Sequence, residues 1–98
     1  MDVIESSINT SGKEYKENYK RYESFVKNLK DNITKAQKGG GEEKIKLHKS
    51  RNKMLARERI EALLDPDTPF MEFNPLAGYG MYNDKAPCAG IVTGIGII

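Results

Sequence analysis

The chain has 98 residues, which is enough for one small domain with at most one core. Hydrophobic residues make up 38% of the chain and charged residues 31%, so any core that it forms alone will be thin. The net charge of +2 is too small to indicate binding to a polyanion. A single cysteine excludes an intrachain disulfide and any multi-cysteine zinc site. No apolar run approaches the roughly 20 residues of a membrane span.

The N-terminal residues 1–18 contain acids and no apolar segment. A secretory signal has an apolar central region, and a transit peptide is rich in Arg and poor in acids. The sequence therefore predicts a cytoplasmic protein.

A long amphipathic helix is predicted over residues 11–37, opened by a capping box from Ser11 to Glu14. Its apolar positions recur at steps of three and four residues: Tyr15, Tyr19, Tyr22, Val26, Leu29, Ile33 and Ala36. The other faces are nearly all polar, so this single stripe is expected to dock on a partner surface. Tyrosines suit such half-wet interfaces. A cofactor-binding stripe remains the alternative.

Three glycines, Gly39, Gly40 and Gly41, are expected to end this helix, because glycine accepts the left-handed conformation of a helix C-cap. The alternative is a phosphate-binding loop. Such loops usually follow a strand, whereas these glycines follow a helix and precede Glu42 and Glu43, which would repel phosphate.

A basic run extends from Lys44 to Arg59, with seven Lys or Arg against one Glu, together with His48. On a helix these cations spread around the axis instead of forming one face, and no aromatic residue lies among them to stack on bases. A solvated or partner-facing surface is the favoured interpretation, with nucleic acid as the alternative. His48 has no second ligand at metal-binding spacing.

A short amphipathic helix is predicted over Ala56–Leu64, ended by the prolines at 66 and 69. It is expected to turn Ile60, Leu63 and Leu64 inward and Arg57, Glu58 and Glu61 outward.

Two strands are predicted after this helix. Residues 70–73 alternate as in a half-buried strand, and residues 91–98 read as a buried strand whose glycines allow another backbone to approach closely. Residues 75–87 between them form a loop. Cys88 is interpreted as a small inert residue beside a turn, with a reactive thiol as the alternative.

The order of these motifs resembles the start of the carboxyltransferase (beta) subunits of biotin-dependent acyl-CoA carboxylases. The motifs are YKENYK from Tyr15, GGGEEK from Gly39, SRNK from Ser50, ARERIEALLDP from Ala56, AGYGMY from Ala77 and GIVTGIG from Gly90. Their residues are most similar to those of the methylcrotonyl-CoA carboxylase branch, and the likeness spans nearly the whole chain. An ordered series of this kind is far more specific than any single motif.

The resemblance implies an α+β fragment. A long N-terminal helix and short helices would lead into the first β-strands of a crotonase-like carboxyltransferase N-domain. Residues 1–10 are expected to be a lead, residues 11–66 a helical lead-in, and residues 67–98 the truncated start of that domain.

The resemblance also implies carboxyl transfer from carboxybiotin to 3-methylcrotonyl-CoA in leucine degradation, by backbone amides that stabilise the enolate and the biotin ureido oxygen. Those segments lie beyond residue 98, so no catalytic, cofactor-binding or metal residue is assigned, and the chain alone is expected to be inactive. Biotin would be carried by a partner alpha subunit, and other beta subunits and acyl-CoA would complete the enzyme. A propionyl-CoA or other acyl-CoA carboxylase subunit, or a non-catalytic helical interaction module, is the alternative.

Four positions depart from the family pattern. Asn52 and Ala56 stand where Gly and Pro are common, and Cys88 and Ala89 replace two glycines, a change expected to stiffen the loop.

Overall fold

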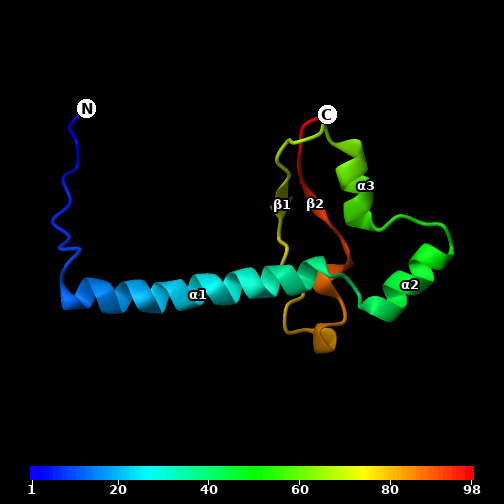
Figure 1. Cartoon of the computed structure of the whole chain (residues 1–98), viewed down its shortest axis with the longest axis horizontal. Coiled ribbons are helices and arrows are strands. Elements are labelled where there is room, and N and C mark those ends of the chain that lie inside the picture. The colour runs from blue at the N-terminus through cyan, green and yellow to red at the C-terminus, as the bar shows by residue number, and fades with distance from the viewer. The chain divides into compact units, whose positions relative to one another are not determined.

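A computed structural model describes residues 1–98, which form an α+β fragment of helices and one two-stranded sheet, as predicted (Figure 1). The chain divides into two compact units, Met1–Asp31 and Asn32–Ile98. We describe each unit by itself. No helix is long and apolar enough to cross a membrane.

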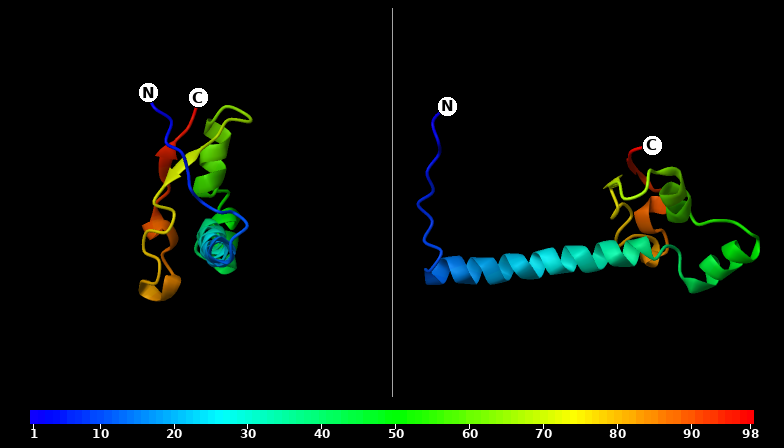
Figure 2. Two further views of the ribbon diagram at one scale, coloured as in Figure 1. Left: turned by 90° about the vertical axis from the view of Figure 1, so that its left-hand side faces the viewer. Right: turned by 45° about the horizontal axis from the view of Figure 1, so that its top comes forward.

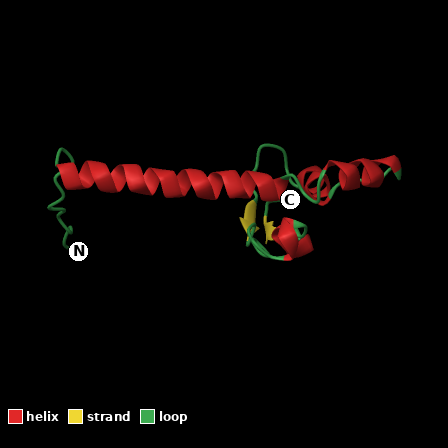
Figure 3. Ribbon diagram, turned by 90° about the horizontal axis from the view of Figure 1, so that it is seen from below, coloured by secondary structure: helices red, strands yellow, loops and turns green.

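Helix α1 (Lys13–Gln37) confirms the predicted long helix to within two residues at its start, and Figure 3 shows it as one continuous helix. The capping box expected from Ser11 to Glu14 is wrong. The Ser11 hydroxyl donates to the Asn9 side-chain oxygen (2.9 Å), and the first helical turn closes from Lys16 N–H to the Gly12 carbonyl (3.2 Å). The side chain of Asn9 thus organises the turn that precedes the helix.

The glycines after α1 end the helix as predicted. Gly39 has φ of 74°, and its N–H donates to the Ala36 carbonyl at 3.2 Å. Gly41 has φ of 99° and opens α2 (Glu42–Ser50), where its carbonyl accepts from Ile45. Both angles lie in the left-handed region that favours glycine.

The basic run is divided between two helices. Helix α2 ends at Ser50, Asn52 takes a left-handed φ of 55°, and α3 (Ala56–Leu63) begins after this break. The inward and outward faces predicted for α3 are partly wrong. Leu63 is 62% exposed, while Arg57 turns inward because it pairs with a carboxylate on the first strand.

The sheet consists of β1 (Met71–Phe73) and β2 (Thr93–Ile95), which pair antiparallel with Glu72 opposite Gly94. Figure 2 shows both strands beside α3 in two views. Buried and exposed residues alternate in β1 as predicted for residues 70–73, but the polar residue faces inward. Glu72 is half-buried, while its apolar neighbours Met71 and Phe73 are exposed.

The predicted burial of residues 91–98 is wrong. The strand covers only residues 93–95, and Ile91, Ile95 and Ile98 are exposed, because no second layer of this chain lies over them. The close approach predicted at the glycines is confirmed. A Cβ on Gly94 would meet the Met71 carbonyl and the Phe70 ring, and one on Gly96 would meet Leu64. Backbone also joins the strand to the end of α3, from Asp65 N–H to the Ile97 carbonyl (2.9 Å).

Candidate functional site

The most buried point of the chain lies where Arg57, Glu72 and Cys88 meet, and Cys88, at 5% exposure, is its only buried residue. These three side chains come from α3, β1 and the turn Pro87–Gly90. The cluster therefore joins three segments that are far apart in the sequence.

The Arg57 guanidinium holds the cluster by hydrogen bonds. It donates to both Glu72 carboxylate oxygens at 2.6 Å and, through Nη2, to the Cys88 sulfur at 3.3 Å. The hydrogen bonds that Arg57 donates to Glu72 raise the pKa of Arg57 against the opposing effect of burial, so the guanidinium stays charged. A two-pronged pair of this kind fixes geometry as well as charge.

The Cys88 thiol also donates to the Pro75 carbonyl at 3.2 Å. With the guanidinium on one side and this carbonyl on the other, the thiol is enclosed within the fold. The arrangement suits a structural role, as the sequence-based interpretation of Cys88 expected, and its partners are ones that the sequence did not reveal. One signal was available: Glu72 is a lone acid between Met71 and Phe73 in a strand, and a half-buried carboxylate needs a cation.

The backbone at Cys88 is as distinctive as its side chain. Cys88 and Ala89 have φ of 55° and 51°, and Gly90 follows at 77°. Residues other than Gly, Asn and Asp rarely adopt this left-handed region. The backbone thus favours glycine at both Cys88 and Ala89.

A second polar group spans the break between α2 and α3. The Glu58 carboxylate pairs with Lys49 at 2.7 Å and accepts from Leu55 N–H at 2.8 Å, while His48 Nε2 lies 3.0 Å from the Met54 carbonyl. The Lys49 hydrogen bond, followed by the Leu55 N–H, lowers the pKa of Glu58. These contacts fix the angle of the turn, and no group of three His, Cys, Asp or Glu side chains gathers in the chain.

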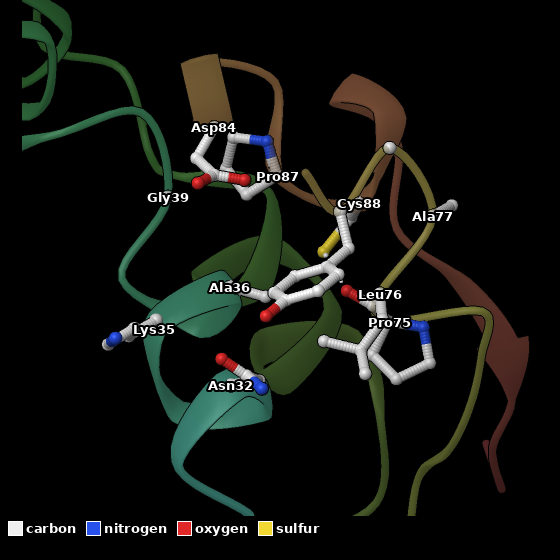
Figure 4. Close-up of a pocket in the computed structure, with 12 residues that line it drawn as sticks. Asn32, Lys35, Ala36, Gly39, Pro75, Leu76, Ala77, Asp84, Pro87 and Cys88 are labelled. Atoms are coloured by element: carbon white, nitrogen blue, oxygen red, sulfur yellow. Dashed lines mark hydrogen bonds between the residues drawn. The ribbon is translucent and has the colours of Figure 1, made fainter. Parts of the chain in front are cut away.

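A pocket of about 170 Å³ lies between the C-terminal end of α1 and the loop 75–88, and Figure 4 shows the residues that line it. Asn32 and Ala36 line its helical side, and Pro75, Leu76 and Cys88 face them. Asp84 at its edge accepts from Gly80 N–H at 2.8 Å. Pockets for small molecules usually measure about 300–1,000 Å³. This pocket is smaller than those.

A larger hollow of about 440 Å³ is bounded by the end of α1, α2, the start of α3 and residues 85–92. Its size falls within the range for ligand sites. However, its only histidine, arginine and carboxylate are His48, Arg57 and Glu58, and each already has a partner within the chain. The hollow also carries the lysines Lys38, Lys44 and Lys85, whereas its histidine, arginine and carboxylate are engaged within the chain.

Residues 47–98 match the family described as Carboxyl transferase domain, and the chain belongs to this family. Among its relatives, the methylcrotonoyl-CoA carboxylase beta chain, mitochondrial, of Dictyostelium discoideum is 46% identical over the whole chain, and the same-named protein of Arabidopsis thaliana is 40% identical. The biotin-dependent 3-methylcrotonyl-coenzyme A carboxylase beta1 subunit of Mycobacterium tuberculosis is 51% identical over 74% of the chain.

The chain spans only 17% of the length of the first two relatives and 14% of the third. Two of the three are mitochondrial by name, which contradicts the predicted cytoplasmic location. The acidic composition of residues 1–18 was the ground for that prediction. Because the matches to the mitochondrial proteins include residues 1–18, the composition of these residues does not indicate where the protein is located.

Proposed function

We propose that this chain is the N-terminal section of the carboxyltransferase subunit of a methylcrotonyl-CoA carboxylase. The full enzyme would move a carboxyl group from carboxybiotin to 3-methylcrotonyl-CoA. The observation that carries the proposal is the match of the whole chain to two methylcrotonoyl-CoA carboxylase beta chains, at 46% and 40% identity.

On this proposal residues 1–10 are a lead, residues 11–66 a helical lead-in, and residues 67–98 the first part of a crotonase-like N-domain. The cluster of Arg57, Glu72 and Cys88 supports a structural role for the helical lead-in. It ties the lead-in helix α3 to β1 and to the turn before β2 through hydrogen bonds that the Arg57 guanidinium and the Cys88 thiol donate. This section positions the first strands, and catalysis belongs to other segments.

The remaining surface supports the same proposal. Met71 and Ile95 lie opposite each other across the strand pair and are 64% and 62% exposed. An apolar face of this kind calls for cover. A two-stranded sheet is also marginal in water without further strands or a packed layer. Additional strands of the full subunit would continue the sheet. Biotin on an alpha subunit, other beta subunits and an acyl-CoA would complete the enzyme.

A chimera tests the proposal. Residues 1–98 replace the matching section of a characterised methylcrotonyl-CoA carboxylase beta chain, and the chimera is purified together with its biotin-carrying alpha chain. We expect carboxylation of 3-methylcrotonyl-CoA at a rate within about tenfold of the parent, because no catalytic group is exchanged. A chimera that assembles with the alpha chain and yet fails to carboxylate would contradict the proposal.

The isolated chain provides the complementary assay. We expect it to transfer no carboxyl group from carboxybiotin to 3-methylcrotonyl-CoA, because on this proposal catalysis belongs to other segments of the full subunit. Transfer above the background rate would show that residues 1–98 hold catalytic groups after all.

A further inference from the structure

We draw no further inference here: the strongest candidate, the exposed apolar stripe of Tyr15, Tyr19, Tyr22, Val26 and Leu29 along α1, carries none because nothing in the structure shows what covers it.

Discussion

The Arg57 guanidinium meets the Glu72 carboxylate face to face, with Nη1 and Nη2 each 2.6 Å from one carboxylate oxygen. This pair joins the first turn of α3 to the middle of β1 across a separation of 15 residues. Its side chains are 28% and 12% exposed, so water screens the pair only in part. It is the strongest link between the helical lead-in and the sheet.

Glu72→Gln is therefore expected to destabilise the fold by about 2 kcal/mol, because a half-buried guanidinium would lose one acceptor and face an amide instead. Urea unfolding followed by circular dichroism measures the loss. Glu61→Gln removes a similar charge from an exposed position on α3 and serves as the control. Equal midpoints for the two variants would show that the pair contributes nothing.

Local patterns in the sequence were enough to predict the helices and the glycine turn. The repeat from Tyr15 to Ala36 predicted α1, and the glycines that end α1 take left-handed angles as expected. These features depend on neighbours within a few residues. The family could also be predicted, because it rests on the order of several motifs.

Features that depend on distant contacts could not be predicted in this way. Arg57 and Glu61 both read as outward-facing on α3, and only the position of β1 explains why Arg57 turns inward. The apolar run from Ile91 reads as buried, yet most of it is exposed, because no other segment of the chain covers it. An apolar segment indicates that its side chains pack against another surface, but the segment does not identify that surface.

Ala89→Gly is expected to stabilise the protein by about 1 kcal/mol. The backbone at Ala89 is left-handed, with φ of 51°, and glycine adopts this region without the steric cost of a Cβ. Thermal unfolding measures the gain. Ala86→Gly, at φ of −122°, is the control and is expected to lose stability, since there glycine only adds freedom to the unfolded chain. A loss at both positions would argue against the left-handed turn.

Gly94→Ala is expected to weaken the strand pair by about 1–3 kcal/mol, because the added Cβ would run into the Met71 carbonyl and the Phe70 ring. Amide hydrogen exchange of β1 and β2 would report the loss directly. Gly40→Ala is the control, since its Cβ would meet only the flexible Lys44 side chain. Unchanged protection of both strands in Gly94→Ala would contradict the register of the sheet.

The ion pair between Lys49 and Glu58 makes stability depend on pH. A carboxyl whose pKa is lowered on folding stabilises the folded state above its ordinary value of 4.5, and this contribution is lost as the pH falls through the folded-state pKa. Lys49→Met is expected to raise the pKa of Glu58 toward 4.5, as measured by NMR titration of the Glu58 carboxyl carbon. Lys46→Met, on the same helix, is the control and should leave the titration unchanged.

The most direct measurement of the central claim compares two hosts for the same segment. Residues 1–98 replace the matching section in a methylcrotonyl-CoA carboxylase beta chain and in a propionyl-CoA carboxylase beta chain, and each chimera is assayed with its own alpha chain and substrate. We expect the first to keep its parent's carboxylation rate within about tenfold and the second to lose more than that, because the segment packs on surfaces of its own branch. Equal retention in both hosts, or better retention in the propionyl-CoA host, would contradict the assignment to methylcrotonyl-CoA carboxylase.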